Sequence, residues 1–172
     1  LPNSLEMRAF LTREDPRDAL ITHDTSIQSL AELPFGAKVG TASLRRGAMV
    51  LNLRPDIKIE VLRGSVETRL GKVETGEVDA TFLAVAGLKR LGLFYKATVI
   101  LQPDEMLPAV CQGTIGVECR KDNKAICELL SQINHAETNS QTLAERAFLT
   151  ALDGSCRTPI GGLAEINGPT LS

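Results

Sequence analysis

A short segment at 40–46 combines residue types that bind anions. It reads Gly-Thr-Ala-Ser-Leu-Arg-Arg, so the hydroxyls of Thr41 and Ser43 precede the guanidinium groups of Arg45 and Arg46. Free backbone N–H groups at the start of a helix and planar guanidinium groups both favour a carboxylate or phosphate ligand. The segment therefore predicts an anion-binding site, and the alternative is an ordinary capped helix with two solvated arginines.

A second basic segment, at 63–69, places Arg63 at the end of an expected strand and Arg69 in the first turns of an expected helix. A cation near a helix N-terminus opposes the helix macrodipole. That local cost is easier to explain if Arg69 has an anionic partner. The partner is either a bound ligand or, as the alternative, a neighbouring acid, Glu67 or Glu60.

A third segment, at 83–90, runs from an apolar strand through Gly87 into Lys89 and Arg90. All three basic segments follow the expected C-terminal ends of strands. In open α/β sheets, ligands bind at that edge. Three such ends that each carry arginine predict a cleft for a carboxylate-rich or phosphate-rich ligand.

The cysteines offer one candidate nucleophile. Cys156 follows an expected helix end and lies beside Arg157, whose charge favours the reactive thiolate. The alternative is a small residue that fills a loop. Cys119 and Cys127 fit packing positions, whereas the sequence leaves the role of Cys111 open. None of the cysteines has C-x-x-C spacing, which argues against a zinc site, and we expect no metal.

Composition excludes several classes of function. Of the 172 residues, 43% are hydrophobic, 23% are charged and only 3% are aromatic, and the net charge is −2. A protein that neutralises nucleic-acid phosphates is usually basic. Positions 41–90 nevertheless hold nine basic and six acidic residues, which favours a small anionic ligand. Neither a membrane-spanning run nor a signal peptide is visible. We expect a cytoplasmic monomer that binds neither nucleic acid nor membrane.

Alternating strand and helix patterns organise most of the chain. Strand–helix alternation with short links is typical of an α/β fold with a mostly parallel sheet. Helices are expected at 29–33, 43–53, 65–74 and 88–91, with Ser43 as an N-cap, and strands at 5–12, 19–22, 37–40, 57–62, 79–85 and 97–101.

The pattern changes after position 113. We expect a strand at 114–119, helices at 123–133 and 139–152, and a last strand at 160–166. The longer helix carries an apolar stripe that is typical of a core-facing surface. Its residues are Leu143, Ala144, Ala147, Phe148, Ala151 and Leu152.

Five motifs together resemble the porphobilinogen deaminase family. They are GTASLRR, LRGSVETRL, DATFLAVAGLKRLGL, LPAVCQGTIGVECR and DGSCRTPIGG, and REDPRDAL near the start fits the same family. They occur in the family's order between position 13 and about position 162. Several long matches in the right order are highly specific.

The resemblance implies a transferase of tetrapyrrole (porphyrin and haem) biosynthesis, hydroxymethylbilane synthase. Such an enzyme joins four porphobilinogen units, with loss of ammonia, into the linear tetrapyrrole 1-hydroxymethylbilane. It works on a dipyrromethane cofactor that a thioether attaches to one cysteine. The family's cysteine motif corresponds to Cys156 here. Each pyrrole carries two carboxylates, which agrees with a cleft that holds several arginines.

The resemblance also assigns site residues. It implies cofactor contacts by Cys156, Thr41, Ser43, Arg45, Arg46, Arg63, Gly87 and Gln112. Substrate contacts fall on Arg63, Arg69 and Arg90. The family's catalytic aspartate lies in an S-x-K-D-x-P segment, which is expected upstream of Leu1. We therefore expect a fragment that lacks turnover by itself.

The family fold implies three parts. Two resemble the lobes of type 2 periplasmic binding proteins, and the third is a small α/β domain. Residues 1–19 and 114–133 are expected to belong to the first domain, 20–113 to the second, and 134–172 to the start of the third. A non-catalytic carboxylate-binding module of the periplasmic-binding class is the alternative function, and a reactive Cys156 distinguishes the two.

Overall fold

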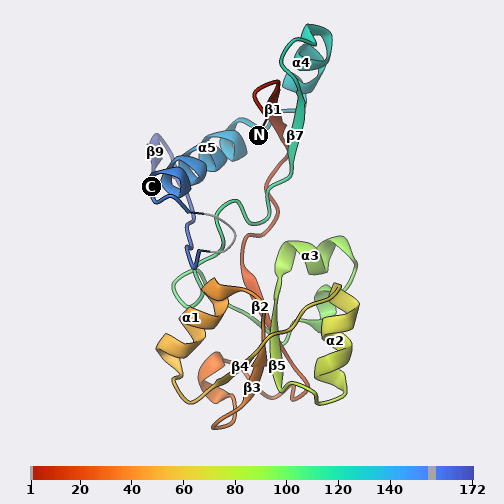
Figure 1. Cartoon of the computed structure of the whole chain (residues 1–172), viewed down its shortest axis with the longest axis vertical. Coiled ribbons are helices and arrows are strands. Elements are labelled where there is room, and N and C mark those ends of the chain that lie inside the picture. Colours follow the sequence, from red (N-terminus) through yellow and green to blue (C-terminus); the bar gives the residue numbers. More distant parts are fainter. Residues whose placement is uncertain (1, 155–157) are drawn as a thin grey trace.

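The computed structural model describes residues 2–154 and 158–172. It has two parts, which are joined by two crossing segments, residues 11–17 and residues 101–115 (Figure 1). One part is built on a five-stranded sheet in the order β4-β3-β5-β2-β6. These strands are β4 (Lys58–Glu60), β3 (Lys38–Gly40), β5 (Ala80–Ala84), β2 (Asp18–Thr22) and β6 (Val99–Ile100).

Helices cover both faces of this sheet (Figure 1). They are α1 (Leu44–Leu53), α2 (Val66–Glu74) and α3 (Val85–Arg90), with short 3-10 turns η1 (Leu30–Glu32) and η2 (Phe94–Lys96). Successive strand side chains point to opposite faces, so β2 supplies two cores. Leu20 packs in the core that contains Val50 of α1, whereas Ile21 packs with Leu70 of α2 and Leu88 of α3. Burial on both faces fixes the sheet between its helices.

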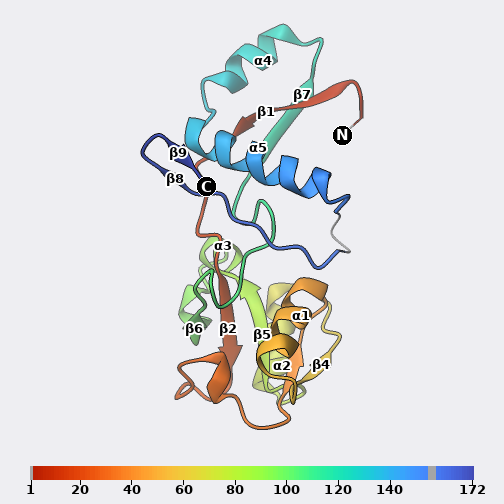
Figure 2. The ribbon, with the colours of Figure 1, turned by 90° about the vertical axis from the view of Figure 1, so that its left-hand side faces the viewer.

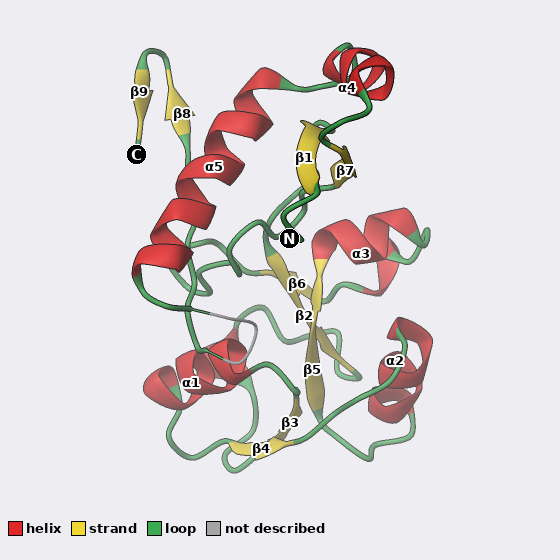
Figure 3. Cartoon of the chain, turned by 45° about the horizontal axis from the view of Figure 1, so that its top comes forward, coloured by secondary structure: helices red, strands yellow, loops and turns green. Residues whose placement is uncertain are grey.

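The other part contains a second, two-stranded antiparallel sheet and two helices, one of which is the longest described helix (Figure 2). The strands are β1 (Leu5–Phe10) and β7 (Gly116–Arg120), which pair with an irregularity between Met7 and Ala9. Helices α4 (Lys124–Ser131) and α5 (Ala136–Ala151) both contact β1, and a small hairpin, β8 (Ile166–Asn167) with β9 (Thr170–Leu171), follows α5 (Figure 3).

The sheet direction corrects one expectation. The α/β class is confirmed, but the sheet is mixed and not mostly parallel. Strand β3 runs parallel to β4 and β5, whereas β2 runs antiparallel to β5 and β6. β2 comes directly from β1 without an intervening helix, so no crossover sets its direction. Hydrophobic alternation does not encode strand direction.

The end of the chain corrects two more expectations. Residues 160–165 form no strand, and β8 begins only at Ile166. The expected apolar stripe of α5 is not its buried face. Leu143 and Phe148 are exposed, and the buried residues are Thr138, Thr142 and Glu145. These polar residues are buried because they bind the neighbouring segments, as described below.

No described helix is both long enough and apolar enough to cross a membrane.

Candidate functional site

The sheet gathers the basic segments at one edge. Because β3, β4 and β5 are mutually parallel, their C-terminal ends lie on the same side. Each of these ends leads into a helix start, at α1, α2 and α3. Strand β2 is antiparallel, so its first residue, Asp18, pairs with Ala84 at the end of β5. An acid therefore lies at the same edge of the sheet as the basic segments.

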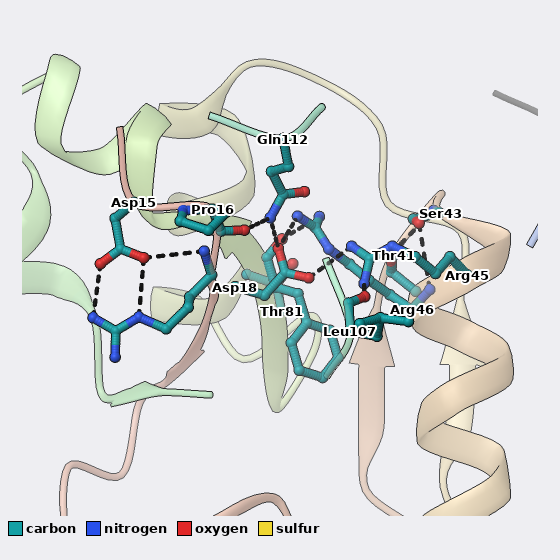
Figure 4. A network of polar contacts seen from close by, with 12 residues as sticks. Asp15, Pro16, Asp18, Thr41, Ser43, Arg45, Arg46, Thr81, Leu107 and Gln112 are labelled. Carbon is teal, nitrogen blue, oxygen red and sulfur yellow. Dashed lines mark hydrogen bonds and ion pairs between the residues drawn. The ribbon is translucent and has the colours of Figure 1, made fainter. Parts of the chain in front are cut away.

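Asp18 is the centre of a buried polar network (Figure 4). Its side chain is fully buried, and Arg45 and Arg46 each donate from Nη2 to a different carboxylate oxygen, both at 2.6 Å. Gln112 Nε2 donates to Asp18 Oδ1 at 2.9 Å and to the carbonyl oxygen of Pro16 at 2.6 Å. One carboxylate thus holds together the start of α1, the start of β2 and the segment before β7.

The local sequence fixes where α1 starts. Ser43 is the N-cap, as predicted, and its hydroxyl accepts a hydrogen bond from the backbone N–H of Arg46 at 3.4 Å. Thr41 is buried, and its Oγ1 accepts from the N–H of Ser43 at 3.1 Å. Gly40 lets the turn pack closely against Leu62, because a Cβ at position 40 would lie 2.7 Å from Cδ2 of Leu62 and would force that side chain to shift. This turn directs both arginines toward Asp18.

The network carries surplus positive charge. Burial alone would raise the pKa of Asp18, but the charges and hydrogen bonds of Arg46 and Arg45 outweigh burial and lower that pKa. Two guanidinium groups therefore face one carboxylate. Their remaining contacts are neutral carbonyls, with Arg46 Nη1 on Phe82 and Arg45 Nη1 on Leu107. The Nε atoms of both arginines are buried without a hydrogen-bond partner among the described residues.

The arginines of the second segment lie apart from this network. Arg69 donates from Nε to the carbonyl oxygen of Gly64 at 3.0 Å, and no ion pair to Glu67 or Glu60 forms among the described residues. Arg63 is exposed and pairs with no described residue. Both side chains remain available for an external ligand.

The third segment lines a separate cavity of about 540 Å³ between the two parts of the chain. Gly87 and Arg90 lie on its α3 side, and Gly113 lies opposite. Lys89 also lines it and pairs with Glu14 at 2.8 Å, whereas exposed Arg90 has no ion pair within the described ranges. Among the site residues expected from the sequence, the structure joins Thr41, Ser43, Arg45, Arg46 and Gln112 in one network.

Sequence reasoning missed a second buried ion pair. Arg13 binds Glu145 of α5 through two hydrogen bonds, from Nη1 at 2.5 Å and from Nη2 at 3.2 Å. Glu145 also accepts from the backbone N–H groups of Cys111 and Ala164. Arg13 Nε donates to the carbonyl oxygen of Gln112 at 3.0 Å, which connects this pair to the Asp18 network. REDPRDAL contains both Arg13 and Asp18, but their partners come from distant segments.

Two cysteines bear on the sequence-based hypothesis. Cys156, the expected attachment point, lies outside the described residues. Cys111 is half-buried, and its pKa is raised by burial and by the charge of Glu145. A raised pKa disfavours the thiolate, so Cys111 is the less reactive kind of thiol.

The fold has the architecture of a periplasmic-binding-protein lobe, and comparison with solved structures supports this class. A putative methionine-binding lipoprotein of Bacillus subtilis matches 85% of this chain and 65% of its own, with a TM-score of 0.50 and 16% identity. A YaeC-family lipoprotein of Enterococcus faecalis matches 83% and 68%, with the same TM-score and identity. At such identity, the likeness concerns the fold alone.

Sequence comparisons identify the family. The model for the porphobilinogen deaminase dipyromethane cofactor-binding domain matches residues 1–128, and the model for the C-terminal domain of that enzyme matches residues 140–172. Porphobilinogen deaminases of Nitrobacter winogradskyi and Paracoccus denitrificans are 57% and 50% identical over 99% of this chain. The chain belongs to the porphobilinogen deaminase family. It spans 54% of the length of these relatives.

Proposed function

We propose that the protein containing this chain is a hydroxymethylbilane synthase. It joins four porphobilinogen units, with release of ammonia, into 1-hydroxymethylbilane. The observation that carries the proposal is the buried pair Arg45 and Arg46 on a single carboxylate, Asp18. Membership of the family supplies the chemical identity of the ligand that such a pair would hold.

The chain's donors fit a dipyrromethane group. That cofactor carries four carboxylates, and it supplies a terminal pyrrole whose free α-carbon is the nucleophile for chain growth. The surplus guanidinium charge beside Asp18 suits anionic acceptors, as do the two Nε donors that have no partner in the described part of the chain. A carboxylate that replaces water in this buried setting gains more from each charge than it would on the surface.

We assign two groups of binding residues. Cofactor contacts fall on Thr41, Ser43, Arg45, Arg46, Arg63, Gly87 and Gln112, with the thioether on Cys156. Substrate contacts fall on Arg63, Arg69 and Arg90. Arg63 and Arg90 are assigned because both side chains are exposed and neither forms an ion pair within residues 2–154 and 158–172. Their charges thus remain available for an incoming anion.

The domain division follows the same proposal. Residues 1–19 and 114–133 belong to domain one, residues 20–113 to domain two, and residues from 134 onward to domain three. The separate sheets of β1–β7 and of β2–β6 support this division. We further propose that the enzyme is cytoplasmic, because free thiols suit a reducing compartment. We also propose that it is a monomer.

Intact-mass spectrometry of the full-length protein tests the proposal. We expect the purified protein to carry a mass increment of two pyrrole units, and peptide mapping to place it on Cys156. Cys156→Ser should lose the increment, whereas Cys111→Ser should keep it. An unmodified wild-type mass, together with no release of ammonia from porphobilinogen, would instead favour a non-catalytic carboxylate-binding module.

A further inference from the structure

Two thiols and a carboxylate converge far from the Asp18 network. Cys119 of β7 lies directly opposite Glu6 of β1 in the antiparallel register. Directly opposed residues on one face have Cβ atoms about 4.5–5.5 Å apart. Cys127 of α4 packs against the same place, with its Sγ 3.5 Å from Cys119 Sγ and 3.5 Å from Glu6 Oε1. The three potential ligand atoms all lie within 4.8 Å of one another.

These separations match those around a tetrahedral metal ion. With Zn–S of about 2.3 Å and Zn–O of about 2.0 Å, tetrahedral angles place two sulfurs about 3.8 Å apart, and a sulfur and an oxygen about 3.5 Å apart. In the structure, Sγ of Cys119 and Sγ of Cys127 lie 3.5 Å apart, and Sγ of Cys127 lies 3.5 Å from Oε1 of Glu6. Small side-chain rotations would therefore place all three atoms on one ion.

We propose that Glu6, Cys119 and Cys127 form a binding site for one thiophilic divalent cation of the Zn²⁺ class, with water as the fourth ligand. The chain spacing had argued against such a site because no C-x-x-C motif is present. Here, however, the strand register and the packing of α4 bring together ligands from three elements.

The charges around the three ligands are consistent with a dication. Binding of the cation would displace one proton from each thiol to solvent, so two thiolates and one carboxylate would surround the metal. Arg8 Nη1 lies 3.9 Å from Glu6 Oε1 and supplies the one positive charge that balances this set.

The backbone holds the site in place without the metal. Arg8 Nε donates to the carbonyl oxygen of Cys127 at 3.1 Å, which ties α4 to β1. The side chain of Asn123 accepts from the N–H of Ile126 and caps α4 one turn before Cys127. A site on such elements loses little conformational freedom when it binds an ion.

Zinc titration of the full-length, metal-free protein tests the proposal. The protein is kept reduced with a phosphine, and Zn²⁺ is titrated against a chromophoric chelator. We expect the wild type to bind one more Zn²⁺ per chain than Cys119→Ser/Cys127→Ser. Glu6→Gln should lower the Zn²⁺ affinity of that site about tenfold or more. Loss of a residue that only supports a metal ligand already costs roughly tenfold, and Glu6 is proposed as a ligand itself. Cys111→Ser is the matched control and should bind like the wild type.

A second readout separates ligation from folding. Cd²⁺ bound to thiolates gives a near-ultraviolet charge-transfer band that scales with the number of bound sulfurs. We expect each single variant, Cys119→Ser or Cys127→Ser, to keep about half of the band, with an unchanged far-ultraviolet circular dichroism spectrum. Equal Zn²⁺ stoichiometry and an equal band in wild type and double variant would overturn the proposal. The proposal would also be overturned if the reduced wild-type protein bound no ion at Cys119 and Cys127. Formation of a disulfide between these two cysteines on oxidation, without metal binding in the reduced state, would count as that result.

Discussion

Arg13 and Glu145 lie 132 residues apart in the sequence and form a buried, two-point ion pair. Their side chains are only 8% and 2% exposed. Among the described residues Glu145 accepts four hydrogen bonds, two from Arg13 and one each from the N–H groups of Cys111 and Ala164. This contact fastens α5 to the segment between β1 and β2 and to the segment before β7.

Breaking this pair should destabilise the protein strongly. Glu145→Gln removes the charge and leaves the Arg13 guanidinium buried and uncompensated, which typically costs about 3–5 kcal/mol of unfolding free energy. Urea denaturation measures the change. The exposed pair Lys72–Glu77 is the control, and Glu77→Gln should cost no more than about 1 kcal/mol. Similar losses of unfolding free energy in both variants would show that burial of the Arg13–Glu145 pair does not increase its contribution to stability.

Acid should weaken the Asp18 network. The pKa of Asp18 is lower in the folded chain than in the unfolded chain, where it is about 3.9. The stability that this group contributes is therefore complete above about pH 4 and is lost as pH falls through the folded-state pKa. We expect the wild-type midpoint in urea to fall on acidification below about pH 4. Asp18→Asn should be less stable at pH 7 and should show a shallower acid slope, and an unchanged slope would contradict this assignment.

Gly113 should not tolerate a side chain. Its φ is +83°, and an added Cβ would collide with the carbonyl oxygen of Glu14 in the neighbouring crossing segment. Gly113→Ala should therefore cost at least about 1–3 kcal/mol of unfolding free energy. Gly71→Ala, in α2 with open space around its Cβ, should instead stabilise by about 0.5–1 kcal/mol. Thermal unfolding compares them, and a neutral Gly113→Ala would mean that the two crossing segments can separate.

Arg90 should act on ligand binding and not on stability. It is the last residue of α3, lies exposed beside the cavity that this helix lines, and pairs with no described residue. In the full-length enzyme, Arg90→Gln should raise KM for porphobilinogen about tenfold or more, the cost of one charged hydrogen bond, with an unchanged urea midpoint. Lys58→Gln, at the start of β4 and thus at the opposite edge of the sheet, should change neither. An unchanged KM in Arg90→Gln would remove this residue from the substrate contacts.

Local signals predicted the starts of α1 and α2, whereas α3 and α5 each begin three residues earlier than expected. Ser43 and Ser65 both cap helices, as hydroxyl residues before an amphipathic run should, and the three basic segments do follow strand ends at one edge. The role of Asp18 was not predictable because its partners depend on the direction of β2. Glu145 was missed for a related reason. Its helix carries an apolar stripe on another face, and the stripe dominated the interpretation of the pattern.

The placement of β2 has a consequence for biosynthesis. Among the described strands, β2 pairs with β5 and β6, which leave the ribosome about 60 and 80 residues later. Both described partner strands follow β2 in the sequence, so a nascent chain carries Leu20 and Ile21 without these strand partners during that interval. Mutations that slow elongation through residues 80–100 should prolong this exposed state, in which chaperones have the longest access to the half-made domain.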